Sequence, residues 1–267
     1  MTHILSLAAG TLPEFLPDQV AIAAGQSGFT HVGFTIEPSH WTPELAKATK
    51  SAIREYNLSV LDTEVVWIPE GGVLTDDHRL IIDAGAELGA ANILVVSSDP
   101  DPDRTAGALH QLCEWAQPAN MSVALEFLMI TAVRSLDSAL DIIKRCDHPA
   151  AAVLIDSLHF QRAGHAPADL KSVDRNLLNY SQICDGQLHC ENNMDAYLTD
   201  AVDLRSAPGE GELPLASLLE ALPPAIPLSL EVRSKAYRDR YSDATDRAAA
   251  VRQQSLAYFN DIGISIR

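Results

Sequence analysis

Three carboxylates in this chain stand where short apolar runs end. Glu126 ends MSVALE, Asp156 ends AAVLID and Glu231 ends PLSLE. A short, continuous apolar run is typical of a strand buried on both faces. A carboxylate at the carboxyl end of such a strand is badly placed for a core and well placed for an active site. Gln182, in SQICD, holds a similar place in a fourth, weaker run.

These residue types indicate a metal site. Three buried carboxylates that converge on one point raise each other's pKa unless a cation neutralises them. Glu126, Asp156 and Glu231, joined by the carbonyl of Gln182, make an all-oxygen set that suits Mn²⁺ or Mg²⁺ better than Zn²⁺, which prefers nitrogen and sulfur. We expect Mn²⁺ or Mg²⁺, with Co²⁺ or Zn²⁺ as alternatives. A metal held there could polarise a substrate carbonyl while a carboxylate on each face of the carbon exchanges the proton.

Parallel strands are what would bring these four residues together. Alternating strand-like and helical runs predict eight strands, at His3–Ala8, Phe29–Ile36, Leu58–Val66, Asn92–Ser97, Met121–Phe127, Val153–Asp156, Asn176–Cys184 and Pro227–Val232. The helices between and after them are predicted at Leu16–Gly25, Thr42–Tyr56, Asp76–Leu88, Asp103–Ala116, Ser135–Arg145, Pro214–Leu222 and Ser242–Phe259.

This rhythm predicts an α/β fold, a single (β/α)8 TIM barrel that occupies residues 1–267 as one domain. No GxGxxG or Walker sequence follows the first strand, which argues against an open doubly wound sheet. The carboxyl ends of the strands in such a barrel gather on one face, so the four polar residues meet in space. The longest irregular segment, 186–214, is long enough to be a functional loop.

Composition narrows the class of partner. The formal charge is −17, from 36 acidic and 19 basic residues, so the phosphate backbone of a nucleic acid would be repelled. The four cysteines include no CxxC pair, and reduced thiols are the simplest interpretation. Residues 1–20 lack an export signal, and no run of 18 apolar residues occurs. We therefore expect a cytoplasmic protein with a small-molecule substrate and no membrane or nucleic-acid partner.

Several motifs together resemble the xylose isomerase-like TIM barrel superfamily, in its sugar phosphate isomerase/epimerase group. They are LEF with Glu126, the DxxH of Asp156 and His159 extended as HFQRAG, SQICD, RSAPGEGELPL and SLEV with Glu231. The resemblance implies that Glu126, Asp156, Gln182 and Glu231 bind one divalent metal and that the two glutamates are the acid/base pair. Barrels of this group commonly associate, so we also expect a homodimer or homotetramer.

The third ligand is the point where the chain departs from the family, because many members carry histidine where this chain has Gln182. An amide oxygen remains a competent ligand, and Asp185 and His189 are the alternatives.

Four further residues are predicted to bind the substrate. His159 could donate to a substrate oxygen, and Arg205 resembles the arginine that family members point at the substrate. Arg162 follows a strand end, as does Arg233, and an arginine there could bind a carboxylate or phosphate. Trp67 could form a wall of the pocket. The alternative interpretations are helix capping or packing for His159, a solvated loop position for Arg205, pairing with the crowded acidic site for Arg162, and plain packing for Trp67.

The predicted activity is an isomerase or epimerase that moves a proton beside the carbonyl of a sugar or sugar-like keto-polyol, through an enediolate. The alternatives are a lyase or dehydratase acting on a cyclic keto-substrate of the inosose or dehydroshikimate type, or a non-catalytic barrel. Repair of abasic DNA is disfavoured. The resembling nucleases use a histidine-rich site for several zinc ions, and the early strand ends of this chain carry no matching set of histidines.

Overall fold

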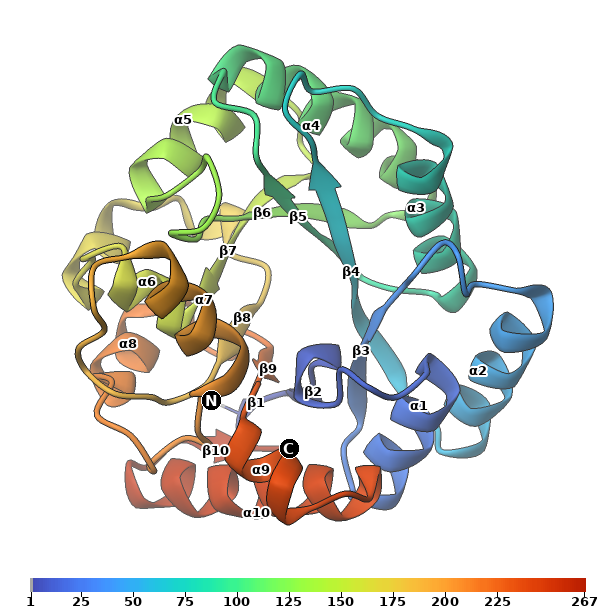
Figure 1. The fold of residues 1–267 in the computed structure, drawn as a ribbon, viewed down its shortest axis with the longest axis vertical. Coiled ribbons are helices and arrows are strands. Elements are labelled where there is room, and N and C mark those ends of the chain that lie inside the picture. Colours follow the sequence, from blue (N-terminus) through green and yellow to red (C-terminus); the bar gives the residue numbers. More distant parts are fainter. Residues whose placement is uncertain (1) are drawn as a thin grey trace.

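A computed structural model describes residues 2–267 as a closed barrel of eight parallel strands, β2-β3-β4-β5-β6-β7-β8-β9, surrounded by helices (Figure 1). The strands are β2 (Leu5–Leu7), β3 (His31–Thr35), β4 (Ser59–Ile68), β5 (Asn92–Ser97), β6 (Ser122–Glu126), β7 (Ala151–Asp156), β8 (Ser181–Ile183) and β9 (Leu228–Leu230). All eight coincide with predicted strands, so the predicted (β/α)8 barrel is confirmed.

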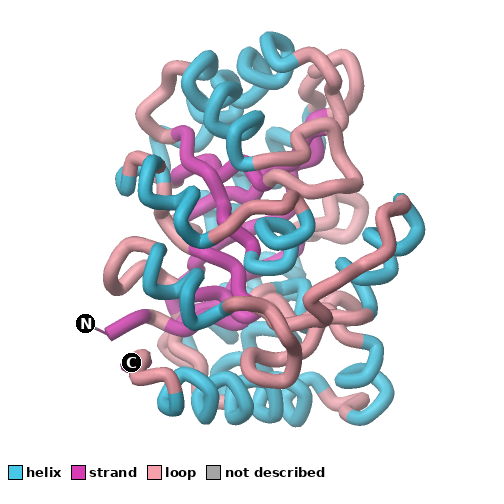
Figure 2. The backbone as a smooth tube through the Cα atoms, turned by 90° about the vertical axis from the view of Figure 1, so that its left-hand side faces the viewer, coloured by secondary structure: helices cyan, strands magenta, loops and turns pink. Residues whose placement is uncertain are grey.

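The chain begins and ends in a separate two-stranded sheet. The short strand β1 (Thr2–His3) pairs in parallel with β10 (Ser265–Ile266). Figure 2 shows the two ends of the chain close together, with the barrel strands inside and the helices outside.

Seven helices follow the predicted pattern. They are α1 (Pro17–Gln26), α2 (Pro43–Glu55), α3 (Asp76–Leu88), α4 (Pro102–Ala116), α5 (Leu136–Cys146), α8 (Leu215–Ala221) and α10 (Ala244–Asp261). Three of them begin at proline, whose fixed φ suits a first helical turn. Within residues 2–267, none of the helices combines the length and apolar composition that crossing a membrane requires.

Three helices were not predicted: α6 (Ser157–Arg162), α7 (Met194–Asp203) and α9 (Lys235–Arg240). α7 lies inside 186–214, so the expectation that this whole segment is irregular was wrong. Asn193 caps α7 by accepting a hydrogen bond from the backbone N–H of Ala196, but Met194 and Leu198 remain about half exposed. With little of the helix buried, the apolar periodicity that reveals a helix is weak.

Strand alternation decides which side chains enter the barrel. On β5, Leu94 and Val96 belong to the inner cluster, whereas Val95 packs outward against the helices. The same alternation places Leu125 and Ile155 outward. Successive side chains of a strand point to opposite faces, so the residues that follow, Glu126 and Asp156, point into the barrel. By the same rule Gln182 and Glu231 point inward, beside the outward residues Ile183 and Leu230.

Candidate active site

The four predicted metal ligands meet at the carboxyl ends of the barrel strands, and all are buried. Asp156 and Gln182 are direct neighbours in the register of β7 and β8. A cavity of about 120 Å³ opens here and is lined by the charged or polar side chains of Glu64, Glu126, His159, Arg205, Glu231 and Arg233, together with apolar side chains.

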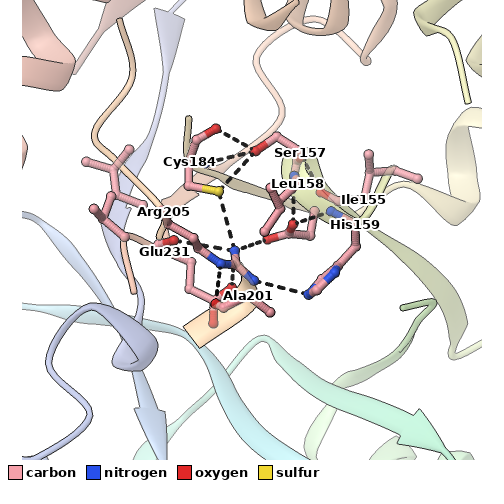
Figure 3. Close-up of polar contacts among 12 residues, drawn as sticks. Ile155, Ser157, Leu158, His159, Cys184, Ala201, Arg205 and Glu231 are labelled. Carbon is pink, nitrogen blue, oxygen red and sulfur yellow. Dashed lines mark hydrogen bonds and ion pairs between the residues drawn. The ribbon is translucent and has the colours of Figure 1, made fainter. Parts of the chain in front are cut away.

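Arg205 is the centre of the polar network in this mouth (Figure 3). Its Nη1 lies 2.7 Å from Asp156 Oδ2 and 2.9 Å from Glu231 Oε2. Its Nε donates to the carbonyl of Ala201 at 2.8 Å, and its Nη2 lies 3.1 Å from His159 Nε2. Each of the three guanidinium nitrogens is therefore engaged by the protein, and Nη1 bridges two of the predicted metal ligands.

Asp156 divides its two oxygens between two tasks. Oδ1 accepts hydrogen bonds from the backbone N–H groups of Leu158 and His159, both at 2.9 Å, and so caps α6. Oδ2 binds Arg205. Burial alone would raise the pKa of Asp156, but the charge of Arg205 and the backbone hydrogen bond outweigh it and hold the pKa below its usual value. Asp156 is thus an ionised carboxylate at neutral pH.

The two glutamates are held closer to their protonated form. Burial raises the pKa of Glu126 well above its usual value, and the charges of Asp156 and Glu231 add to the effect. Burial also raises the pKa of Glu231, to about 7, although Arg205 opposes the shift. A carboxyl with a pKa near 7 can accept and donate protons at physiological pH.

The hydroxyl of Thr11 holds the backbone on both sides of Glu231. The hydroxyl of Thr11 donates to the carbonyl of Leu230 at 2.7 Å and accepts from the N–H of Val232 at 2.9 Å. A Cβ on Gly10 would stand 2.4 Å from Glu231 Oε1, so only glycine lets the first loop approach the carboxylate this closely.

His159 is a neutral imidazole in this site. Burial lowers its pKa to about 4, more than the nearby charge of Asp156 raises it. Because a guanidinium only donates hydrogen bonds, His159 Nε2 accepts from Arg205, and the ring proton is on Nδ1.

The donors present fit a hard divalent cation. One ligand atom each of Glu126, Asp156 and His159 lie within 4.8 Å of one another. Glu126 Oε1 and both polar side-chain atoms of Gln182 are buried without a hydrogen-bond partner. Unpartnered buried polar groups are costly, and a cation beside Asp156 would give these oxygens a partner. His159 was predicted as a substrate contact, and the structure places it beside both carboxylates, with its Nε2 engaged by Arg205.

Two acidic residues on β4 extend the site inward. Glu64 accepts a hydrogen bond from the hydroxyl of Thr35 at 3.1 Å, and Tyr180 donates to Asp62 at 3.4 Å. Burial raises the pKa of both carboxyls, and that of Asp62 well above its usual value. Asp62 was missed in the sequence, although its spacing of two from Glu64, within an apolar strand, places both on one face.

Other predicted residues have different surroundings. Trp67 lines the cavity and donates to the Ser98 hydroxyl at 2.7 Å, but it is 42% exposed. Arg162 does not reach the cavity, because its Nε pairs with Asp200 Oδ2 at 2.6 Å. Its remaining nitrogens donate to two backbone carbonyls, those of Gln187 and Leu188. The expectation that Arg162 contacts substrate is thus not supported by its position.

Asp185 and His189, the alternatives to Gln182 as third metal ligand, do not face the barrel cavity. The carboxylate of Asp185 accepts from the backbone N–H groups of Gly186, Gly209 and Leu213 at 2.9 to 3.0 Å, so it shapes the loop after β8. His189 is exposed and lines a separate surface pocket. Neither lines the barrel cavity.

The fold and the site together define a (β/α)8 barrel with a carboxylate-rich mouth. The chain matches the family model described as xylose isomerase-like TIM barrel over residues 21–259. It belongs to the xylose isomerase-like TIM barrel family.

Several solved structures have similar folds. A crystal structure of the IolI protein with a bound zinc atom shares 18% identity, with a TM-score of 0.75 and 97% of each chain covered. D-allulose 3-epimerase from Methylomonas sp., in complex with D-allulose, shares 14% identity, with a TM-score of 0.71 and 97% of each chain covered.

A fusion protein of a xylose isomerase-like TIM barrel and 4-hydroxyphenylpyruvate dioxygenase shares 19% identity, with a TM-score of 0.77. The whole of the present chain aligns with it but covers 45% of its length. No curated protein sequence matches the chain. At these identities the likeness concerns the fold.

Proposed function

We propose that this protein is a divalent-metal-dependent isomerase or epimerase that moves a proton at the carbon beside a substrate carbonyl. The observation that carries the proposal is the pair Glu126 and Glu231, two buried carboxyls with raised pKa that line one cavity beside Asp156. Family membership and structural neighbours such as D-allulose 3-epimerase support the same class of reaction. The proposed substrate is a sugar or sugar-like keto-polyol.

The metal would be held by Asp156 and Glu126, with Gln182 or Glu231 completing the set. The oxygen-rich donors favour Mn²⁺ or Mg²⁺, while IolI provides an example of zinc in a similar fold. When bound, the metal supplies Lewis-acid polarisation of the carbonyl and stabilises negative charge on the substrate oxygens.

The two glutamates divide the proton transfers. Glu231, with a pKa of about 7, is ionised in a large fraction of molecules at neutral pH and takes the proton from the carbon. Glu126, which lines the same cavity, returns a proton to the enediolate. The reverse reaction exchanges these roles.

Three other residues would prepare the site. Arg205 keeps Asp156 ionised and holds the Glu231 carboxylate in place. His159 stays neutral, with its Nε2 bound to Arg205. Trp67 and the apolar wall exclude water from the reacting carbon.

Solvent exchange tests the proposal. The purified protein with Mn²⁺ or Mg²⁺ is incubated in D₂O with a panel of keto-sugars, inososes and keto acids, and deuterium beside the carbonyl is detected by NMR. We expect exchange with at least one compound, and a loss of about 10²- to 10⁴-fold in Glu126→Gln and Glu231→Gln. Loss of water from the substrate would instead identify a lyase. Absence of exchange and of metal binding would favour a non-catalytic barrel.

A further inference from the structure

The three arginines predicted near the mouth differ in what they hold. Arg205 binds Asp156, Glu231, Ala201 and His159 with its three nitrogens, as described above. Arg162 is taken up by Asp200 and two backbone carbonyls. Arg233 differs from both. Among residues 2–267, no group forms an ion pair within 4.0 Å or a hydrogen bond with its side chain, and its Nε is buried without a partner.

Arg233 is placed where a ligand would meet it. It follows β9 two residues after Glu231, is half-buried, and lines the same 120 Å³ cavity. Its charge lowers the pKa of Glu64 and of Glu231 through space, against the larger effect of burial. Neither glutamate lies within ion-pair distance of it: one Glu64 oxygen accepts from Thr35 and the other has no hydrogen-bond partner, while one Glu231 oxygen binds Arg205. The guanidinium fork therefore remains available to a ligand.

The geometry and charge of the Arg233 guanidinium favour an anionic ligand. A guanidinium presents parallel N–H donors that match the two oxygens of a carboxylate or phosphate, and such charge-assisted pairs are about twice as strong as neutral hydrogen bonds. A neutral hydroxyl would satisfy one donor and leave the partly buried charge uncompensated.

The size of the cavity favours a carboxylate over a phosphate. A cavity of roughly 150 Å³ accommodates the six carbons of benzene, so about five non-hydrogen atoms fit into the 120 Å³ available here. A carboxylate takes three of them and leaves room for the two atoms of the carbonyl, with the next carbon at the mouth of the cavity. A phosphate group would take most of the space.

We propose that Arg233 binds the carboxylate of the substrate, so that the substrate is a short keto or hydroxy acid rather than a neutral sugar. This inference rests on the proposed function, since it assigns the acid group to the substrate of that site. Arg233 is then a specificity-determining residue, and the apolar side chains Leu94, Val96 and Leu128 face the carbon skeleton.

Binding of a matched acid and amide tests this inference without a reaction. Calorimetric titrations with pyruvate, pyruvamide and inorganic phosphate are carried out on the full chain with Mg²⁺ present. We expect wild type to bind pyruvate about tenfold or more tighter than pyruvamide, and tighter than phosphate. Arg233→Gln should lose the preference for the acid, and Arg233→Lys should keep part of it.

The control is Arg175→Gln, an exposed arginine away from the cavity, which should leave the preference unchanged. Equal binding of pyruvate and pyruvamide to wild type, or an undiminished preference in Arg233→Gln, would overturn the inference. Tighter binding of phosphate than of pyruvate would overturn the carboxylate assignment.

The two proposals fail separately. Deuterium exchange on a neutral keto-sugar that is unaffected by Arg233→Gln would overturn the acid substrate and leave the isomerase standing. An Arg233-dependent preference for pyruvate without exchange on any compound would support the anion site and refute the reaction.

Discussion

Replacing Glu231 by glutamine should stabilise the metal-free protein at alkaline pH. The carboxyl is buried, and its pKa in the folded protein is raised from 4.5 to about 7. The folded state therefore binds this proton more tightly than the unfolded state. The stability that the protonated form contributes is fully present below pH 4.5 and is lost as the pH rises through 7.

The size of the stability difference follows from the difference between the pKa of Glu231 in the folded and in the unfolded protein. Each pKa unit corresponds to about 1.36 kcal/mol, so ionising Glu231 in the folded protein costs about 3 kcal/mol at pH 8 and about 1 kcal/mol at pH 5.5. Glutamine imitates the protonated carboxyl and has no charge to bury. Glu231→Gln should therefore exceed wild type in free energy of unfolding by these amounts, although it removes a residue of the proposed catalytic pair.

Urea unfolding in the presence of EDTA, followed by circular dichroism at pH 5.5 and pH 8, measures both differences. Glu220→Gln, an exposed glutamate on α8, is the matched control and should change stability by less than about 0.5 kcal/mol. Mg²⁺ should stabilise wild type more than the variant and so reduce the difference in free energy of unfolding between them. A variant less stable than wild type at pH 8, or a difference that does not grow with pH, would refute the reasoning.

Three further predictions concern Arg205, Glu126 and Arg162. Arg205→Met leaves two buried carboxylates without their cation and should lower the free energy of unfolding by about 3–5 kcal/mol in urea titrations at pH 8; an effect below that of a surface arginine would contradict the bridging role. Glu126→Gln should weaken Mn²⁺ binding by about tenfold or more in calorimetric titrations, and unchanged affinity would remove Glu126 from the ligand set. Arg162→Gln should release the segment 187–200 and speed its cleavage in limited proteolysis, whereas wild-type cleavage rates would show that the ion pair with Asp200 does not hold it.

The barrel could be predicted from the sequence because each strand carries its own local signal. β5, β6 and β7 are short apolar runs, as strands covered on both faces must be. The same signal located Glu126 and Asp156, since a charge that interrupts such a run stands out. The helix α7 left no comparable signal, because its apolar residues are not concentrated on a buried face.

The contacts of the arginines could not be predicted in this way, because they depend on how loops fold back over the barrel. Arg205 reaches Asp156 only because isolated bridges pair Leu204 with Ser234 and Asp185 with Ser206, which brings the loop after α7 over the mouth. Arg162 has the same residue type and a similar strand-end position, yet Asp200 on α7 draws it away. Residue type gave the chemistry of each arginine, and tertiary structure decided its partner.

The double role of Asp156 makes the first turn of α6 a spectroscopic reporter. Its carboxylate accepts hydrogen bonds from two backbone amides and also binds the Arg205 guanidinium. A newly bound metal ion would draw electron density from this carboxylate and so weaken its hydrogen bonds to the two amides. Hydrogen exchange at Leu158 and His159 would then change on loading of the site, before turnover and without a known substrate. A ligand screen could follow these two amide resonances by NMR instead of following catalysis.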